Sequence, residues 1–361
     1  MVMDKINIKT TINKLAVQLT SFCNLDCQYC YLPNRNIKNT ITDEVVDSII
    51  TSIEELHDNV SIIWHSGEPL VIGTKRFENI LSKFDKIKDK VSHCIQTNGT
   101  LISDDWCSLF KKYDVQIGVS IDGYEPENKF RVDRKGNNSF EDIIKGITTL
   151  KRNEIAFTVI AVVGQDGVFN AERLYNFCNE IGCWSLGINI VEDEGVYKKK
   201  YKIQRDDVSI FWKDLFLLWS NNPLFRVREF DNFLTWSKWV VKGTPINYKF
   251  DLLPTISVNG DVVLLSPEFL NIASNQFANF KVGNILSSSL LDITSKLDNY
   301  QYVNDFFNGI KKCEETCKYF SFCRGGQASN KYFENNNINS TETNYCIMTK
   351  QTLVDTLIET L

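Results

Sequence analysis

Residues 16–190 alternate between short apolar segments and longer amphipathic segments, and this alternation constrains the fold more than any other feature. The amphipathic segments have the period of helices, and the apolar segments between them have the length of buried strands. The expected strands are residues 16–20, 60–64, 91–97, 115–120, 156–163 and 185–190. Such alternation predicts parallel strands joined by crossover helices. Six units are fewer than a closed barrel of eight contains, so we expect an α/β fold with a partial (β/α)6 TIM barrel.

Polar motifs follow the first four of these strands. They are the cysteine loop 23–30, the turn Ser66-Gly67-Glu68-Pro69, the pair Asn98-Gly99 and the segment 120–123. In barrels of parallel strands, the chemistry collects at the carboxyl ends of the strands. We therefore expect all four motifs on one rim of the barrel, where they would form a site.

Three cysteines in the first of these motifs, Cys23, Cys27 and Cys30, have the spacing CxxxCxxC. Thiolates at such spacings usually wrap an iron–sulfur cluster, and three ligands leave one iron open to a group that is not protein. A zinc site or a redox pair is the alternative. Zinc loops usually combine C-x2-C pairs with a second pair or a histidine, and no histidine lies nearby in the sequence. The spacing favours a cluster.

Composition excludes several classes of protein. A net charge of −5 argues against a nucleic-acid-binding surface. No apolar run reaches the length of a membrane span, and residues 1–14 are too polar for a signal peptide, so we expect a cytoplasmic protein with no membrane partner. In a reducing compartment the eleven cysteines indicate metal binding or catalysis rather than disulfides.

The tail of the chain holds a second group of cysteines, Cys313, Cys317, Cys323 and Cys346. Four thiols suffice for one cluster held entirely by protein, and a four-cysteine zinc site is the alternative. Upstream of them, Asn259-Gly260 between two apolar segments predicts a hairpin with a type I′ turn. We divide the chain into a partial barrel, residues 1–222, and a bridging and cysteine-bearing region, residues 223–361.

The cysteine loop, with Tyr29 before its last cysteine, resembles the signature of radical S-adenosylmethionine (SAM) enzymes. The resemblance implies that the three cysteines hold a [4Fe–4S] cluster whose open iron binds SAM. Ser66-Gly67-Glu68-Pro69 resembles the GGEP motif of that family, which holds the amino group of SAM. The SAM-binding residues that the resemblance implies are Tyr29, Ser66, Gly67, Glu68, Asn98, Ser120, Asp122 and Arg131. A strand-ending turn is the alternative for Asp122, and a surface position for Arg131.

The tail cysteines resemble the SPASM or twitch extensions of peptide-modifying radical SAM enzymes. The full SPASM pattern has seven cysteines for two auxiliary clusters, whereas this chain has Gln327 where a further cysteine would stand. The resemblance therefore implies one auxiliary [4Fe–4S] cluster. The segments 64–70 and 323–346 look like those of the maturases of glycine-rich-repeat peptides, which form cyclophanes.

This resemblance implies a reaction and its partners. The reduced cluster would cleave SAM to a 5′-deoxyadenosyl radical, with a flavodoxin or ferredoxin as the reductant. That radical would remove a hydrogen from a ribosomal precursor peptide, and a carbon–carbon cross-link between an aromatic side chain and a nearby β-carbon would follow. Glu229 and Asp231 are candidates for the base that takes up the proton, although a charged helix start also explains them.

Two other functions stay open. Another SPASM-type modification, either thioether formation or formylglycine-type oxidation, is the alternative within the family, and the missing cysteines disfavour sulfatase maturation. A structural iron–sulfur or zinc protein is the alternative outside enzymes. The motifs that follow strands 60–64 and 115–120 argue against it, because a structural protein needs no SAM pocket.

Overall fold

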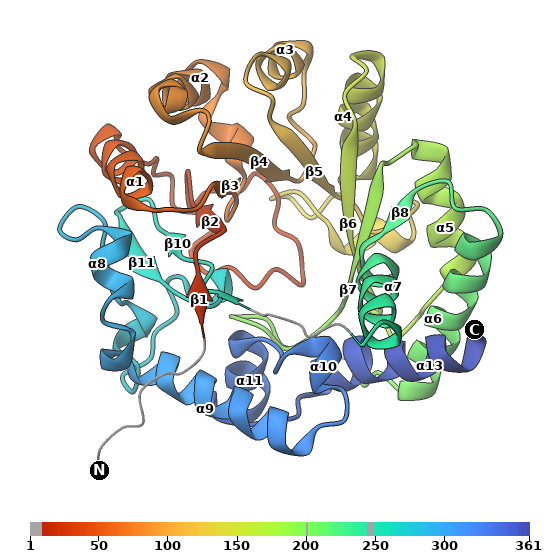
Figure 1. The fold of residues 1–361 in the computed structure, drawn as a ribbon. Helices are drawn as coiled ribbons and strands as arrows, with labels where there is room; N and C mark the ends of the chain where they lie inside the picture. The colour runs from red at the N-terminus through yellow and green to blue at the C-terminus, as the bar shows by residue number, and fades with distance from the viewer. Residues whose placement is uncertain (1–8, 200, 244–248) are drawn as a thin grey trace.

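The computed structural model describes residues 9–199, 201–243 and 249–361. Within them, ten strands form one sheet in the order β12-β11-β10-β2-β3-β4-β5-β6-β7-β8, which curves into an open barrel (Figure 1). Strands β2 to β8 are parallel to their neighbours and follow chain order. The six predicted strands are β2 (Lys14–Val17), β3 (Val60–Trp64), β4 (Val91–Thr97), β5 (Gln116–Ser120), β6 (Phe157–Val163) and β7 (Ser185–Ile190). The predicted partial barrel is confirmed.

Six helices cover the outer face of this sheet (Figure 1). They are α1 (Asp43–Glu55), α2 (Thr74–Lys83), α3 (Asp104–Lys112), α4 (Phe140–Arg152), α5 (Ala171–Ile181) and α6 (Arg205–Asn221). Helix α1 begins at the predicted cap, where the Thr42 side chain accepts a hydrogen bond from the Val45 N–H. Its apolar face, which includes Val46 and Ile49, is buried. Burial of this face against the strands stabilises the helix far more than its intrinsic propensity does.

The second half of the chain extends the same sheet, which the sequence did not predict. β10 (Thr255–Ile256) pairs parallel with β2 and antiparallel with β11 (Asp261–Val263). The predicted hairpin at Asn259-Gly260 is confirmed, but its type I′ turn is wrong. Only Gly260 has a positive φ, because the Ser257 hydroxyl accepts hydrogen bonds from the N–H groups of Asn259 and Asp261 and supports a wider turn.

Helices α9 (Gln301–Thr316), α10 (Phe320–Cys323), α11 (Ala328–Asn335) and α13 (Thr352–Thr360) run across the open side of the barrel (Figure 1). The other elements are β1 (Thr10–Thr11), β8 (Arg226–Val227), β9 (Phe250–Asp251), β12 (Gly283–Asn284), α7 (Arg228–Val241), α8 (Leu290–Thr294) and α12 (Asn344–Cys346). Leu353 and Leu357 of α13 are buried, and the Trp212 indole of α6 donates to the Met348 carbonyl. The two halves of the chain therefore share core contacts, and the division at residue 222 remains a prediction.

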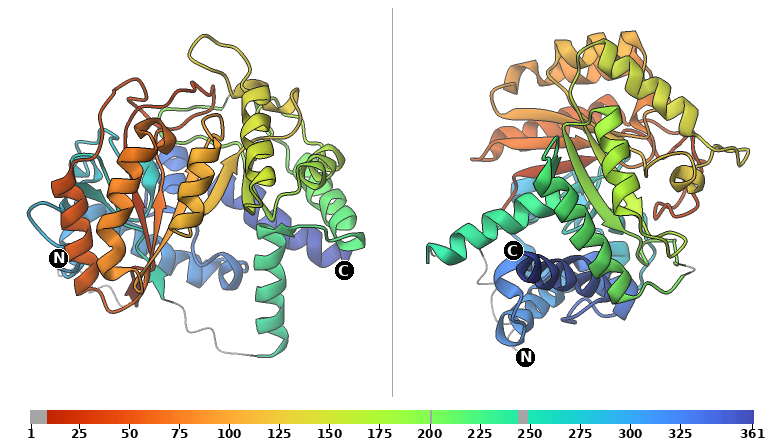
Figure 2. Two further views of the ribbon diagram at one scale, coloured as in Figure 1. Left: turned by 90° about the horizontal axis from the view of Figure 1, so that it is seen from above. Right: turned by 90° about the vertical axis from the view of Figure 1, so that its right-hand side faces the viewer.

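No helix in the described ranges is long and apolar enough to cross a membrane. Helix α7 instead projects from the body of the molecule (Figure 2), and part of its surface, including Trp239, is exposed.

The aromatic cluster around Trp64 is the core beneath the rim, and it yields a stability prediction. Trp64 is 0% exposed and contacts Phe77, Phe84 and His93, with ring centroids 5.7, 5.9 and 5.8 Å away. Trp64→Ala should lower the free energy of unfolding by about 3–5 kcal/mol, because it leaves a cavity in this cluster. Trp239→Ala, at a position 43% exposed, should change it by less than about 0.5 kcal/mol. Urea unfolding followed by circular dichroism measures both, and equal effects would contradict this packing.

Candidate active site

Two arginines hold the backbone of the cysteine loop. The Arg134 guanidinium donates to the Cys23 carbonyl at 2.7 and 2.9 Å, and Arg35 Nη1 donates to the Cys27 carbonyl at 3.1 Å. The Cys23 N–H in turn donates to the Arg35 carbonyl. With its backbone held in this way, the loop places the thiols of Cys23, Cys27 and Cys30 on the wall of a cavity. The sequence analysis missed both arginines, because nothing local links them to the loop.

The turn after β3 is fixed against the residues that precede the cysteine loop. Ser66 and Gly67 both have positive φ angles, 70° and 77°, and the Glu68 N–H donates to the Phe22 carbonyl at 2.8 Å. A Cβ on Gly67 would lie 2.3 Å from the Thr20 carbonyl oxygen, so only glycine fits. The close approach of these two backbones sets the position of Glu68.

The Glu68 carboxylate is buried at the centre of the rim. It accepts hydrogen bonds from the Thr97 hydroxyl at 2.7 Å and from the N–H groups of Asn98 and Leu70 at 2.8 and 3.0 Å. Burial raises the pKa of Glu68 to about 7, although these three hydrogen bonds oppose the shift. A cation bound in the cavity would favour the ionised carboxylate, as the amino group of SAM would do.

Tyr29, Asp122 and Arg131 form one buried network. Asp122 accepts from the Tyr29 hydroxyl at 2.6 Å, from Arg131 Nη2 at 2.9 Å and from the Val162 N–H at 2.9 Å. Tyr29 and Arg131 line the cavity, whereas Asp122 lies behind its wall with both oxygens engaged. Its geometry suits a residue that positions Tyr29 and Arg131, and its predicted contact with SAM stays a prediction.

Asn98 and Ser120 lie on the same wall. Asn98 Nδ2 donates to Asn24 Oδ1 at 2.8 Å, which ties it to the cysteine loop, and the Ser120 hydroxyl accepts from Gln96 Nε2 at 2.8 Å. The structure thus brings nine predicted site residues together around a cavity of about 380 Å3. They are Cys23, Cys27, Tyr29, Cys30, Gly67, Glu68, Asn98, Ser120 and Arg131. Ser66 is buried and lies outside this lining.

Three carboxylates that the sequence analysis missed complete the cavity: Glu192, Glu194 and Glu268. Burial and the negative charge of Glu268 raise the pKa of Glu192 and of Glu194 well above the ordinary value. Burial also raises the pKa of Glu268, but its hydrogen bonds from the Ser266 hydroxyl and a backbone N–H oppose this. Burial thus favours the protonated form of all three carboxylates, and only hydrogen bonds or a bound cation oppose it. Glu192 and Glu194 follow β7 directly, so the strand-end rule could have found them.

The two predicted base candidates lie elsewhere. Glu229 accepts from Arg228 at 2.6–2.7 Å and from the Ile188 N–H at 3.2 Å, and Asp231 accepts from Arg226 at 2.8 Å. Neither carboxylate is on the cavity wall. These contacts suit a charged helix start, which was the alternative explanation.

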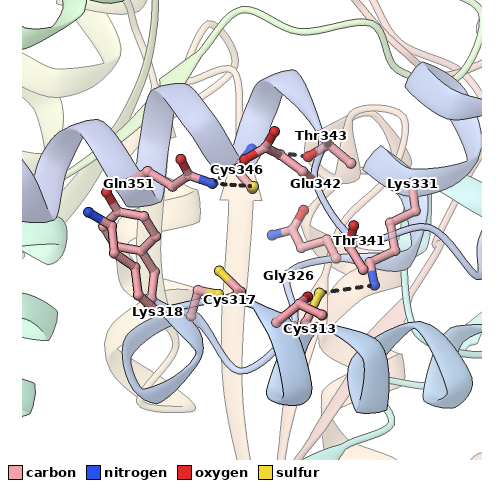
Figure 3. Close-up of a pocket in the computed structure, with 15 residues that line it drawn as sticks. Cys313, Cys317, Lys318, Gly326, Lys331, Thr341, Glu342, Thr343, Cys346 and Gln351 are labelled. Atoms are coloured by element: carbon pink, nitrogen blue, oxygen red, sulfur yellow. Dashed lines mark hydrogen bonds between the residues drawn. The ribbon is translucent and has the colours of Figure 1, made fainter.

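The four tail cysteines surround a second cavity, of about 310 Å3 (Figure 3). Lys331 Nζ lies 3.9 Å from Cys313 Sγ and Gln351 Nε2 lies 3.6 Å from Cys346 Sγ, both as hydrogen-bond donors. Within the described parts of the chain, no group of three or more His, Cys, Asp or Glu side chains is arranged to hold a metal ion. Gln327 lies on the walls of both cavities, so the two cavities are neighbours.

Residues 17–178 match the family model of the radical SAM superfamily. An uncharacterized protein of Synechocystis sp. is 33% identical over 369 residues, which cover 97% of this chain and 92% of the relative. This chain belongs to the radical SAM superfamily. It is therefore an enzyme, and membership implies a [4Fe–4S] cluster and SAM as cofactors. The non-enzymatic alternative is excluded.

Relatives and solved structures extend the similarity along the chain. A cysteine-type anaerobic sulfatase-maturating enzyme of Clostridium perfringens is 25% identical over 330 residues, 85% of this chain and 86% of that enzyme. Native anSMEcpe with bound AdoMet and Cp18Cys peptide matches with a TM-score of 0.76 and 22% identity, over 96% of this chain and 97% of that chain. Streptococcus suis SuiB bound to the precursor peptide SuiA matches with a TM-score of 0.68 and 20% identity, over 95% of this chain and 77% of that chain. These structures establish the fold of this radical SAM enzyme.

The residues of the first cavity fit the cofactors that membership implies. Three thiols share one wall, and beside them the buried Glu68 carboxylate has no cationic partner among the ion pairs of the described residues. A cluster would use the thiols, and the ammonium group of SAM would compensate the charge of Glu68.

Gly67 and Gly73 offer a matched test of this fit. Both have positive φ, 77° and 80°, but a Cβ on Gly73 would meet no atom within 4 Å. Gly73→Ala should therefore cost only backbone strain, about 1–3 kcal/mol for its φ of 80° and ψ of 155°. Gly67→Ala must also displace the Thr20 backbone, and it should weaken SAM binding to the reconstituted enzyme by about tenfold or more. Equilibrium dialysis with labelled SAM measures this, and equal affinities of the two variants would refute the proposed role of the turn.

Proposed function

We propose that this radical SAM enzyme oxidises a side chain of a ribosomal precursor peptide. The observation that carries the proposal is that Glu192, Glu194 and Glu268 line the same cavity as the three cysteines. Cys23, Cys27 and Cys30 would hold the cluster, and Glu68 would hold the amino group of SAM. When bound and reduced, these cofactors supply the 5′-deoxyadenosyl radical that removes a hydrogen atom from the peptide.

Glu268 is the base that we assign to the second half of the reaction. After a hydrogen atom is removed, a stable oxidised product requires the loss of one more electron and one proton. Glu268 accepts hydrogen bonds from the Ser266 hydroxyl and a backbone N–H, which favour the ionised carboxylate although burial opposes it. It lines the same cavity as the three cysteines. This assignment replaces Glu229 and Asp231.

The tail cysteines are the site that we assign to an auxiliary [4Fe–4S] cluster, which would accept the electron. The four cysteines line a space of about 310 Å3, and their resemblance to the SPASM or twitch extensions supports a cluster over the zinc alternative. Gln327 lines both this space and the reaction cavity, so the two are neighbours in the structure. This proximity supports electron transfer between the two sites.

Two products are compatible with this site. The relatives named as sulfatase-maturating enzymes favour formylglycine-type oxidation, the alternative that the missing cysteines had disfavoured. The single set of tail cysteines and Gln327, at the place of a further cysteine, favour the cyclophane cross-link. We take formylglycine-type oxidation as the first candidate and the cross-link as the second. A flavodoxin or ferredoxin remains the proposed reductant.

Replacing Cys23, Cys27 and Cys30 together by alanine tests the radical site. The triple variant should form no 5′-deoxyadenosine from SAM under dithionite, because the cluster that binds SAM has lost its ligands. The wild-type enzyme should contain about eight irons and the variant about four, on the two-cluster assignment. Iron analysis and chromatography of anaerobically purified protein give both readings. Retained SAM cleavage would reject the first site, and zinc in place of the residual iron would reject the auxiliary cluster.

Synthetic peptides distinguish the two products. A peptide with Cys or Ser at the modified position should yield an aldehyde that reacts with a hydrazide reagent, whereas a matched Ala peptide should not. A cyclophane product would instead have lost two hydrogen atoms without hydrazide reactivity, and only in a peptide with an aromatic residue two places before its partner. A loss that requires cysteine and leaves no aldehyde would indicate a thioether. If mass spectrometry shows no change in the Cys peptide, the Ser peptide or the aromatic peptide, the proposed function is wrong.

In the same assay, Glu268→Gln should separate the two halves of the reaction. It should keep the formation of 5′-deoxyadenosine but lower product yield by about a hundredfold, the usual contribution of a general base. The exposed Glu172→Gln on α5 is the control and should preserve both. If Asp231→Asn reproduced the loss of product and Glu268→Gln did not, the base would lie where the sequence first suggested.

A further inference from the structure

Lys331 on α11 is a buried lysine beside the tail cysteines. Its residue is only 1% exposed, and Nζ points at Cys313 Sγ from 3.9 Å (Figure 3). Burial of an ammonium group is costly unless a negative charge lies close to it. Burial lowers the pKa of Lys331, and only negative charge close to Nζ would keep this ammonium group protonated.

Cysteine thiols, rather than carboxylates, lie around this amino group in the described part of the chain. The ion pairs of the described residues give Lys331 no carboxylate partner, and its charge interacts instead with the thiols of Cys313, Cys323 and Cys346. Neutral thiols would leave the buried ammonium uncompensated, whereas four thiolates that hold a [4Fe–4S] core in its oxidised form make a dianion. The position of Lys331 thus suits an anionic cluster in this cavity.

The surroundings of Lys331 are shaped for an ammonium group. The Phe306 ring lies 5.4 Å from Nζ, a separation suited to a cation–π contact. Gly309 faces it from α9, where a Cβ would lie 2.8 Å from Nζ and about as close to the carbonyl oxygens of Ile338 and Ser340. The absence of a side chain at residue 309 leaves room for the ammonium group between ring, carbonyls and thiol.

We propose that Lys331 compensates the charge of the auxiliary cluster and raises its reduction potential through a hydrogen bond to the Cys313 thiolate. Accepting an electron increases the negative charge of the cluster, and a cation close by stabilises the reduced form more than the oxidised form. Hydrogen bonds to cluster sulfurs act in the same direction. Lys331 is thus a positioning residue that makes the cluster a better acceptor for the electron released in the reaction cavity. This inference rests on the auxiliary cluster of the proposed function.

The test uses the full chain with Cys23, Cys27 and Cys30 replaced by alanine, so that only the tail can bind a cluster. In this background, Lys331→Met removes both charge and hydrogen bond, Lys331→Gln removes only the charge, and Lys331→Arg keeps both. Lys318→Met is the matched control, because Lys318 lines the same cavity but its side chain is 75% exposed and its charge is screened by water. Titration with mediators, followed by electron paramagnetic resonance, gives the midpoint potential.

Lys331→Met should lower the midpoint potential, Lys331→Gln should lower it less, and Lys331→Arg and Lys318→Met should leave it near that of the parent. Loss of iron from folded Lys331→Met and Lys331→Gln chains, with retention in Lys331→Arg, would also support charge compensation. An unchanged potential in Lys331→Met, or an arginine variant that behaves like the methionine variant, would overturn the inference. Absence of any tail iron in the parent background would instead overturn the auxiliary cluster itself. Circular dichroism of each chain confirms folding, and Lys331→Gln carries the test if Lys331→Met does not fold.

Discussion

The buried carboxylate of Glu68 is the interaction on which the reaction cavity depends. Its oxygens accept hydrogen bonds from the loop that follows β3 and from residues at the end of β4. The neighbouring Gly67 packs closely against the backbone that precedes the cysteine loop. A buried carboxylate is tolerated only while its oxygens stay satisfied, so these three loops cannot shift independently. The local backbone of residues 66–68 therefore sets where the thiols and their neighbours lie.

Charge distinguishes the two cavities of this radical SAM enzyme. The first is lined by four carboxylates together with the three cysteines, which suits a cationic cofactor and a proton acceptor. The second has four thiols and the buried Lys331, which suits an anionic cluster. Gln327 lines both of them. A proton and an electron that leave the peptide would thus go to separate sites, each with a charge that favours its acceptance.

The sequence by itself determined the barrel and most of the rim. The periodic spacing of apolar residues predicted β2 to β7 and the helices between them. Each of these elements buries one face, and the apolar residues of that face are visible within its own short segment of sequence. The rule that parallel strands end at one edge then brought Cys23, Glu68, Asn98 and Ser120 to a single cavity from four separate motifs. These features can be predicted from the sequence because the hydrophobic pattern and the geometry of the strand–helix unit both repeat along the chain.

Only the tertiary structure decided the rest, since those contacts join segments that carry no local signal. Strands β10 to β12 have two or three residues each, too few to show a period, and they are recognised only by pairing beside β2. The same extension brings Glu268 to the cavity, and packing of α11 on α9 brings Lys331 to Cys313. Whether a strand-end carboxylate faces the cavity or the core depends on its partners: Asp122 turns inward to Tyr29 and Arg131, while Glu192 faces the substrate space. Such choices depend on long-range hydrogen bonds and burial, which a one-dimensional pattern does not contain.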